Sequence, residues 1–248
     1  NVKGKFYFPK RDLSYNKTGI ASWYGPKFHG KLTANGEIYD QYALTAAHKT
    51  LPLPSAVKVT NLQNNKSIIL RINDRGPFVN DRIIDLSSKA ADILDLKKNG
   101  TGLVRVTILK DKSLLLEKLA KNGSFPEIMD LPKPELPTVN IPQTTTVKID
   151  GTNKKYKSIK KRIKYDLNNL KKEYKIFIQL ASFSSSQNAK IMKEKVSYIE
   201  KVKIYKKLIR NKTFYQVKAG PFESVKKVDE LHSLLLQKGM QGAKIIIE

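Results

Sequence analysis

The stretch Ser67-Ile-Ile-Leu-Arg-Ile-Asn-Asp-Arg-Gly-Pro-Phe78 joins a β-branched run to a polar cluster and a Gly-Pro turn. Residues 67–72 are typical of a strand because turn residues bound them on both sides. Similar runs lie on either side of this stretch, at 18–24, 56–60 and 103–108. Residues 87–94 read as one short helix with a serine at its start. Many short strands with a single helix predict a closed β-barrel.

The length and composition of the chain bound its class. Its 248 residues favour one or two domains. Hydrophobic residues make up 40% of it, enough to bury a core and to argue against global disorder. No apolar run reaches the roughly 18 residues that a membrane-spanning helix needs. The sequence has no cysteine, which excludes disulfides, thiol chemistry and Cys-ligated metals.

The chain is strongly basic, with 47 Lys and Arg against 22 Asp and Glu and a formal charge of +25. Most of the lysines are expected to form a solvated surface. The excess of positive over negative charge also favours the attraction of polyanions. Only 7 of the basic residues are Arg. Proteins that bind nucleic acids favour Arg side chains and interleaved aromatic residues. As a binding partner, nucleic acid is therefore less favoured than other anionic polymers or a membrane surface.

Composition divides the chain into an N-terminal extension, a barrel domain, a linker and a second domain, at residues 1–15, 16–110, 111–172 and 173–248. The linker begins with a predicted short helix at 112–119. Five of the eleven prolines then lie between Pro126 and Pro142, and a lysine run follows them. Such a composition predicts a semi-extended, solvated segment.

The last domain alternates strands and helices in the order βαββαβ. We expect these elements at residues 174–181, 186–196, 203–205, 214–219, 224–238 and 243–247. This order predicts a small antiparallel, ferredoxin-like sheet with two helices on one face. The other face is then free to bind a ligand. The whole chain is therefore expected to be mainly β with a smaller α+β domain.

Three residues of the barrel region are candidates for chemistry, namely Glu37, His48 and Asp74. Each alone has a structural explanation: a surface turn residue, a histidine bonded to the backbone, and an ion pair with Arg75. His29 and His48 with a carboxylate match no metal-site spacing, so we expect no metal.

Taken together, the polar stretches resemble the rare lipoprotein A (RlpA) family over about residues 18–109. The matching segments are Gly19-Ile-Ala-Ser-Trp-Tyr-Gly25, Phe28, Gly30, Thr33-Ala-Asn-Gly-Glu37, Tyr39-Asp40, Leu44-Thr-Ala-Ala-His48, Thr50-Leu-Pro52, 57–61, Arg71-Ile-Asn-Asp-Arg-Gly-Pro-Phe78 and Arg82-Ile-Ile-Asp-Leu-Ser87. The resemblance implies a six-stranded double-psi β-barrel, related in fold to expansins and some endoglucanases.

The resemblance also implies an activity, that of an endolytic peptidoglycan lytic transglycosylase without a cofactor. Such an enzyme cleaves the bond between N-acetylmuramic acid and N-acetylglucosamine without water and leaves an anhydro-muramic end. An internal nucleophile removes the need for a second carboxylate to hold water. The family's catalytic residues fall on Asp74, which we expect to donate the proton, and on Glu37 and His48, which orient substrate or share the proton. Substrate-binding positions are expected at Trp23, Tyr24, Thr33, Asn35, Asn73 and Arg75.

The last 75 residues resemble a SPOR domain, through Phe177-Ile-Gln-Leu-Ala-Ser-Phe183 and Tyr215-Gln-Val-Lys-Ala-Gly-Pro-Phe222. SPOR domains bind glycan strands that lack stem peptides, which accumulate at division septa. Strand alternation places Phe177 and Gln179 on an exposed face with Gln216 and Lys218. Lys218 is expected to meet the lactyl carboxylate of muramic acid, whereas Gln216 stands where the family often has Arg. The expected glycan-binding residues are Phe177, Gln179, Ser182, Gln216 and Lys218.

The resemblance places the protein in the periplasm, at the envelope and septum, where it acts in wall remodelling and daughter-cell separation. Many family members begin with a lipidated cysteine, so we expect either a removed anchor of an outer-membrane lipoprotein or a soluble protein. We expect a monomer that meets a membrane only through such an anchor. The main alternative is a non-catalytic wall-binding protein, since expansins bind polysaccharide without cutting it. Nucleic-acid binding is a weaker alternative because the sheet lacks paired stacking aromatics.

Overall fold

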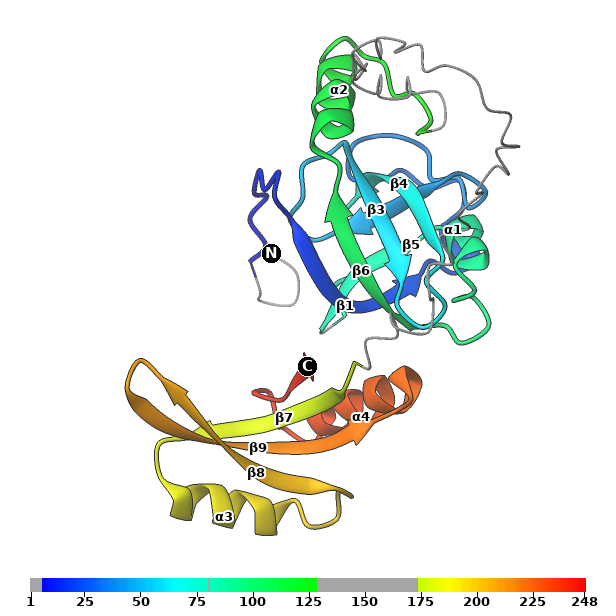
Figure 1. Cartoon of the computed structure of the whole chain (residues 1–248). Helices are drawn as coiled ribbons and strands as arrows, with labels where there is room; N and C mark the ends of the chain where they lie inside the picture. Colours follow the sequence, from blue (N-terminus) through cyan, green and yellow to red (C-terminus); the bar gives the residue numbers. More distant parts are fainter. Residues whose placement is uncertain (1–5, 80, 129–173) are drawn as a thin grey trace, which may run out of the picture. The chain divides into compact units, whose positions relative to one another are not determined.

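The computed structural model describes residues 6–79, 81–128 and 174–248. They form two folded parts, residues 6–128 and residues 174–248 (Figure 1). The proline and lysine runs of the predicted linker lie almost wholly outside the described residues. None of the helices in the described ranges is long and apolar enough to cross a bilayer.

The first part contains a closed six-stranded barrel with the strand order β1-β5-β2-β4-β3-β6, which confirms the predicted fold class. The pairs β1–β5 and β2–β4 are parallel, and the other four pairs are antiparallel. The strands are β1 (Asn16–Trp23), β2 (Thr45–His48), β3 (Ser55–Asn61), β4 (Ser67–Asp74), β5 (Arg82–Leu86) and β6 (Gly102–Ile108).

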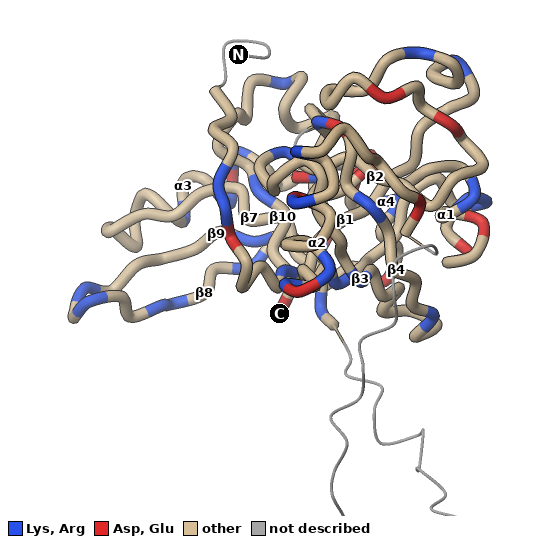
Figure 2. Tube along the Cα trace, turned by 90° about the horizontal axis from the view of Figure 1, so that it is seen from above, with Lys and Arg blue, Asp and Glu red and all other residues tan. Residues whose placement is uncertain are grey.

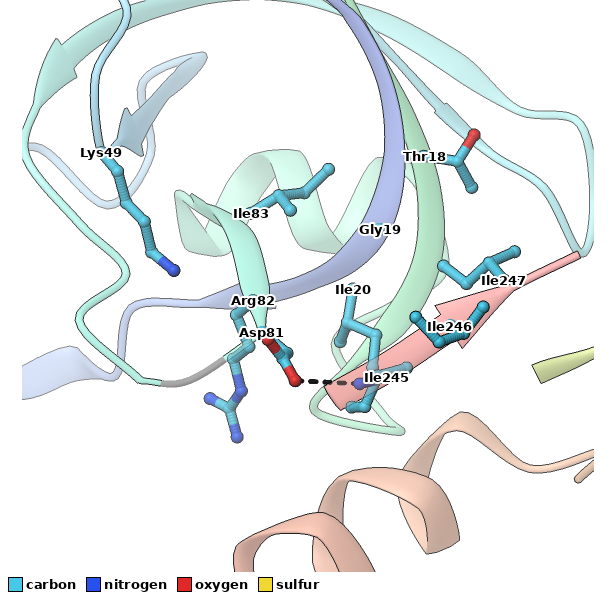
Figure 3. Close-up of a pocket in the computed structure, with 10 residues that line it drawn as sticks. All are labelled: Thr18, Gly19, Ile20, Lys49, Asp81, Arg82, Ile83, Ile245, Ile246 and Ile247. Atoms are coloured by element: carbon cyan, nitrogen blue, oxygen red, sulfur yellow. Dashed lines mark hydrogen bonds between the residues drawn. The ribbon is translucent and has the colours of Figure 1, made fainter. Parts of the chain in front are cut away.

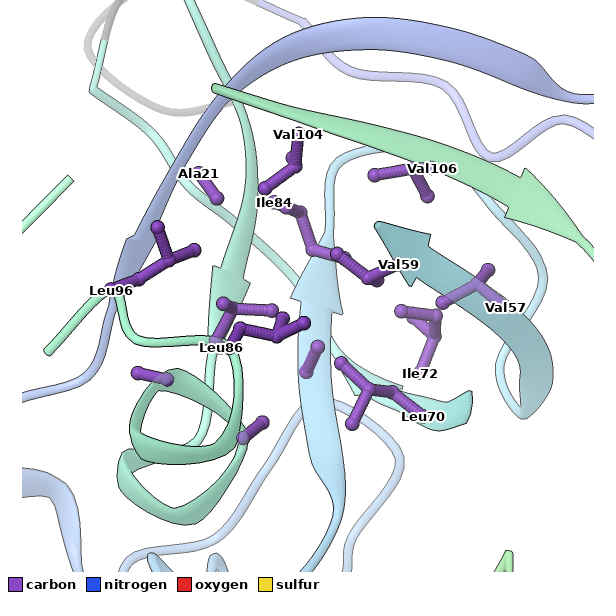
Figure 4. Packing of buried hydrophobic residues seen from close by; sticks show 14 of the residues in the cluster. Ala21, Val57, Val59, Leu70, Ile72, Ile84, Leu86, Leu96, Val104 and Val106 are labelled. Atoms are coloured by element: carbon purple, nitrogen blue, oxygen red, sulfur yellow. The ribbon is translucent and has the colours of Figure 1, made fainter. Parts of the chain in front are cut away.

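Alternate residues of these strands fill the barrel with aliphatic side chains (Figure 4). Residues one position away point to the other face, because side chains in a strand alternate. Each fully buried Leu, Ile or Val stabilises the fold by about 1.5–3 kcal/mol. The side chains labelled in the figure are Ala21, Val57, Val59, Leu70, Ile72, Ile84, Leu86, Leu96, Val104 and Val106.

The parallel contact between β1 and β5 depends on a glycine. Gly19 lies beside Ile83 (Figure 3), and a Cβ atom added at Gly19 would come within 2.6 Å of the Ile83 side chain. Real Cβ atoms essentially never approach another heavy atom so closely. Glycine at this position therefore allows the two strands to close the barrel.

Two helices and a short turn complete the first part. The predicted helix at 87–94 is α1 (Ser88–Ile93), where the Ser87 hydroxyl accepts a hydrogen bond from the Ala90 amide at 3.1 Å. A 3-10 turn, η1 (Pro26–Phe28), follows β1. Leu13 and Tyr15, from the predicted N-terminal extension, pack on the barrel core.

The helix predicted at the start of the linker is α2 (Lys110–Lys121), and it packs on the barrel. Leu116 is fully buried against Ala56 of β3, together with Ile128. The Ser113 hydroxyl accepts a hydrogen bond from the Ala56 amide at 3.0 Å. The segment up to residue 128 therefore packs with the barrel, which differs from the linker predicted to begin at residue 111.

The second part confirms the predicted βαββαβ order. Its sheet has the strand order β10-β7-β9-β8, and every pair is antiparallel. Both helices contribute apolar side chains to one core with Ile178 of β7, so both cover the same face of the sheet. The elements are β7 (Ile176–Phe183), α3 (Ser186–Lys195), β8 (Val202–Ile209), β9 (Lys212–Phe222), α4 (Val225–Gln237) and β10 (Lys244–Ile247).

The strands β8 and β9 are longer than predicted and form a basic hairpin. Figure 2 shows Lys and Arg along β8 and at the tip of this hairpin. These side chains belong to exposed residues, in agreement with a solvated lysine surface, and they are Lys203, Lys206, Lys207, Arg210 and Lys212.

Candidate active site

Asp74 lies at the end of β4 and accepts three hydrogen bonds. Its Oδ2 accepts from the Tyr24 hydroxyl at 2.9 Å. Its Oδ1 accepts from the backbone amides of Ala34 at 2.9 Å and Arg75 at 2.7 Å. The Arg75 guanidinium instead donates to the carbonyl oxygens of His48 and Leu51, at 3.2 and 2.6 Å. The side chain of Arg75 thus serves the neighbouring loop, and Asp74 does not form the ion pair with it that a structural role predicts.

Glu37 lies at the end of the loop 33–37, which turns at Gly36 with a φ of +88°. Its carboxylate forms an ion pair with the buried guanidinium of Arg71. It also accepts hydrogen bonds from the side-chain amides of Asn35 at 2.5 Å and Asn73 at 3.2 Å. A buried charge needs such a partner, so Arg71 and Glu37 fix each other.

The loop 33–37 joins the two carboxylates. The Thr33 hydroxyl donates to Asn35 Oδ1 at 2.7 Å, which closes the turn. The Ala34 amide then reaches Asp74, while Glu37 reaches Asn73, the residue before Asp74. The structure therefore brings together Glu37, Asp74, Tyr24, Asn73 and the residues of this loop.

His48 is separate from this hydrogen-bond network. Its side chain is buried, at 3% exposure for the residue, and its Nδ1 accepts from the amides of Thr50 and Leu51 at 3.2 and 3.0 Å. Burial lowers its pKa to about 4, and the charges of Arg75 and Lys49 act in the same direction. In the described part of the chain it makes no hydrogen bond to Glu37 or Asp74. Its neighbour Ala47 is the β2 residue that pairs with Asp74, so His48 points to the opposite face of the strand.

Aromatic side chains pack around Tyr24, whose hydroxyl donates to the Asp74 carboxylate. The Tyr24 ring lies 5.0 Å from that of Tyr39 and 5.4 Å from that of Phe28, measured between ring centroids. Burial, followed by the charge of Asp74, raises the pKa of the Tyr24 hydroxyl. Trp23, a predicted substrate-binding residue, is partly buried and packs against the barrel core.

An apolar rim that the sequence did not indicate borders the loop 33–37. Leu32 and Ile38 form the bridge at its base and are both more than two-thirds exposed. Phe28, whose ring packs on Tyr24, and Tyr42, whose ring packs on His29, are 48% and 69% exposed. Exposed apolar and aromatic groups beside polar ones suit the faces of sugar rings.

Sequence reasoning missed a third carboxylate, Asp85 of β5. Its Oδ1 accepts a hydrogen bond from the Ser22 hydroxyl, and burial raises its pKa above the ordinary value. Its charge acts on Tyr24 and Tyr39 together with that of Asp74. Among the described residues, we find no group of three or more His, Asp or Glu side chains that could hold a metal ion.

In the second part, the predicted exposed face is largely closed. Gln216 and Lys218 are 8% and 5% exposed, so the prediction that they lie open to ligand is wrong. The Lys218 ammonium pairs with the Glu248 carboxylate and lies 5.5 and 5.1 Å from the ring centroids of Phe177 and Tyr205. Phe177 is buried under this arrangement, Gln179 is partly exposed and Ser182 is exposed.

Comparisons with known proteins agree with both parts of the fold. Residues 16–108 match the family described as lytic transglycolase, and residues 172–246 match the SPOR domain. The barrel is 62% identical over 109 residues to the endolytic peptidoglycan transglycosylase RlpA of Helicobacter pylori, covering 44% of this chain and 35% of that protein.

Two other relatives carry the same description. That of Pseudomonas aeruginosa strain UCBPP-PA14 is 61% identical over 106 residues, which are 42% of this chain and 31% of the relative. That of Rickettsia felis is 50% identical over 141 residues, which are 56% of this chain and 58% of the relative. The matched region thus spans between 31% and 58% of the length of these relatives.

Proposed function

Because this chain joins a barrel of the lytic transglycolase family, similar to RlpA, to a SPOR domain, we propose that it is an endolytic peptidoglycan transglycosylase. It cleaves the bond between N-acetylmuramic acid and N-acetylglucosamine within glycan strands. It acts in the periplasm at the cell envelope, and its natural substrate is septal glycan without stem peptides. A monomer carries out the reaction.

The observation that carries this proposal is the loop 33–37, which fixes two carboxylates at one place on the barrel. Asp74 is held by Tyr24 and by the Ala34 amide, and Glu37 by Arg71 and Asn73. Carboxyl groups are the acids and bases that glycosidic cleavage needs. The exposed rim of Phe28, Leu32, Ile38 and Tyr42 supplies apolar surface for the sugar rings.

The chemistry needs no bound water as nucleophile. The 6-hydroxyl oxygen of the muramic acid attacks its own anomeric carbon while the bridging oxygen leaves with a proton. Since nucleophile and electrophile belong to one sugar, the entropic cost of bringing them together is small. The protein must then position the sugar, supply a proton to the bridging oxygen and remove the proton of the 6-hydroxyl. We assign these two proton transfers to the carboxyl groups around Asp74.

The SPOR domain holds the enzyme on its substrate in this proposal. Ser182 and Gln179 of β7 remain accessible to a glycan strand. Lys218 reaches the lactyl carboxylate of muramic acid by exchanging it for Glu248, which occupies the ammonium in the free protein. A second binding module raises the local concentration of strands at the barrel.

Digestion of purified glycan strands tests the proposed activity. The full chain is incubated with strands that lack stem peptides, and the products are analysed by mass spectrometry for anhydro-muramic ends. We expect such ends with the wild type and a large loss with Asp74→Asn. Binding to sacculi without any product would replace this proposal with the non-catalytic wall-binding role.

A further inference from the structure

Four residues lie in register across four neighbouring strands of the barrel. Ser22 of β1 pairs with Asp85 of β5, Asp85 pairs with Ala47 of β2, and Ala47 pairs with Asp74 of β4. We call these four residues the carboxyl row. Directly paired residues point to the same face of a sheet. With strands about 4.8 Å apart, the backbones of Asp74 and Asp85 are separated by roughly 10 Å.

The carboxyl row lies on the face of the sheet turned away from the barrel core. Ala21, Ala46 and Leu86, each adjacent in sequence to a member of the row, belong to the core cluster. Because strand side chains alternate, Ser22, Ala47 and Asp85 point outward. Asp74 shares this direction through its pairing with Ala47. The two aspartates therefore belong to one surface, although they lie 11 positions apart in the sequence.

Small residues occupy the space between the two carboxyl groups. Ala47 is the residue between them in the row, and Gly76, two residues after Asp74, lies in the adjoining turn. A Cβ atom added at Gly76 would lie 3.7 Å from both the Ala47 Cβ and the Asp85 Oδ2. The φ of Gly76 is +144°, which side chains rarely adopt. A bulkier residue at either position would crowd the approach to Asp85.

The two oxygens of Asp85 differ in the hydrogen bonds that they accept from the described residues. The Ser22 hydroxyl donates to Oδ1 and fixes the carboxyl group. Among the described residues no donor is bonded to Oδ2, which is the oxygen that faces Gly76. The residue is partly exposed. Asp74, by contrast, has both of its oxygens engaged as acceptors.

We propose that Asp85 is the general acid of this site and Asp74 its general base, an inference that rests on the proposed function. The proton on Asp85 passes to the bridging oxygen, and the bond from that oxygen to the anomeric carbon breaks with its electron pair going to the oxygen. The 6-hydroxyl oxygen bonds to the anomeric carbon, and its proton passes to Asp74. A proton then returns from Asp74 to Asp85 through solvent. This assignment replaces Asp74 as the predicted proton donor.

The electrostatic surroundings of Asp85 suit this role. Burial is the largest influence and raises its pKa, and the charge of Asp74 acts in the same direction. The Ser22 hydroxyl and the charges of Arg82 and Lys49 oppose this effect. The hydroxyls of Tyr24 and Tyr39 also lie within the electrostatic reach of both aspartates. Two carboxyl groups in different surroundings divide naturally into an acid and a base.

Two substrates separate the two roles. One is the natural glycan strand. The other is a 2,4-dinitrophenyl glycoside of N-acetylmuramic acid with a free 6-hydroxyl, whose phenolate leaves without protonation. We expect Asp85→Asn to lose about 10²- to 10⁴-fold on the natural strand and less than about tenfold on the aryl glycoside. Asp74→Asn should lose activity on both, and Asp92→Asn, at an exposed aspartate of α1, should lose it on neither.

Full activity of a folded Asp85→Asn variant on natural strands would overturn the inference, and so would equal losses on both substrates. A wild type that forms no anhydro ends would instead refute the proposed function. If Asp85→Asn does not fold, the pH profile of Ser22→Ala decides. Removing the hydroxyl that favours the ionised carboxyl should move the alkaline limb of kcat/KM to higher pH. An unchanged limb would contradict the role of Asp85.

Discussion

Tyr24 donates a hydrogen bond from its hydroxyl to Oδ2 of Asp74 across 2.9 Å, and so ties the end of β1 to the end of β4. Replacing Tyr24 with Phe keeps the ring between Tyr39 and Phe28 but removes this donor. We expect a loss of about 1 kcal/mol in the free energy of unfolding. We also expect a roughly tenfold lower rate of anhydro-end formation, which corresponds to a similar free energy in the barrier. Tyr198→Phe, at an exposed ring of the second part, is the control, and an equal effect there would contradict a special role for Tyr24.

The ion pair of Glu37 and Arg71 predicts a stability effect. Glu37→Gln leaves the buried guanidinium of Arg71 without its main counter-charge. Breaking a buried pair from one side costs about 3–5 kcal/mol. Urea unfolding should therefore show a large decrease for this variant. Glu117→Gln, which breaks the exposed pair with Arg11, should change the free energy of unfolding by less than about 1 kcal/mol. Comparable losses in the two variants would be inconsistent with the buried pair.

The low pKa of His48 makes folding depend on pH. Its pKa is about 4 in the folded chain and 6.5 ordinarily, so the unfolded chain binds the proton more readily between these values. The contribution of the neutral His48 to the free energy of unfolding is complete above pH 6.5 and is lost as the pH falls toward 4. The slope is at most about 1.4 kcal/mol per pH unit. The free energy of unfolding, measured from pH 7 to pH 4, should fall less steeply in a folded His48→Gln variant than in the wild type. Parallel curves for the two proteins would argue against a neutral, buried His48.

The Lys218–Glu248 pair predicts a gain of binding. If Lys218 takes up the lactyl carboxylate, Glu248 competes with the ligand for the same ammonium. Glu248→Gln should therefore strengthen the binding of the full chain to peptide-free muramic-acid strands severalfold, and Lys218→Gln should weaken it. Titration of the two variants and of Glu223→Gln as a control measures this. Weaker binding by a folded Glu248→Gln variant would remove Lys218 from the ligand site.

Gly19 tests the closure of the barrel. Gly19→Ala places a Cβ atom within 2.6 Å of the Ile83 side chain, so this side chain or the two strands must move. Such overpacking costs about 1–3 kcal/mol, which a thermal melt detects. Gly25→Ala has nothing within 4 Å of the added atom and should melt as the wild type does. A Gly19→Ala variant as stable as Gly25→Ala would mean that the two strands do not meet so closely.

Local patterns predict the longer elements well. The β-branched runs at 56–60, 67–72 and 103–108 and every element of the second domain are confirmed, because their alternation or helical period extends over several residues. The four-residue strand β2 and the five-residue strand β5 are too short for such a signal. These two strands pair with each other, and each also makes one of the parallel contacts that align the carboxyl row.

The site is predictable in part for the same physical reason. The resemblance points to Glu37 and Asp74, which the loop 33–37 joins into one hydrogen-bond network. Which face a side chain occupies depends on long-range register, which separates His48 from the pair and brings Asp85 to it. A carboxylate within a strand has no local signal that distinguishes it from a solvated surface group. The closed face around Lys218 depends on Glu248 and Tyr205, which lie far from it in the sequence.

The packing of α2 on the barrel determines where the first folded part can be separated from the rest of the chain. A fragment that stops at residue 110 would strip Leu116 and Ile128 from Ala56 and leave the Ala56 amide without its Ser113 acceptor. Exposed apolar surface of this kind promotes aggregation. A cut placed beyond Ile128 keeps this apolar surface covered, so we expect a fragment that ends there to remain folded and unaggregated.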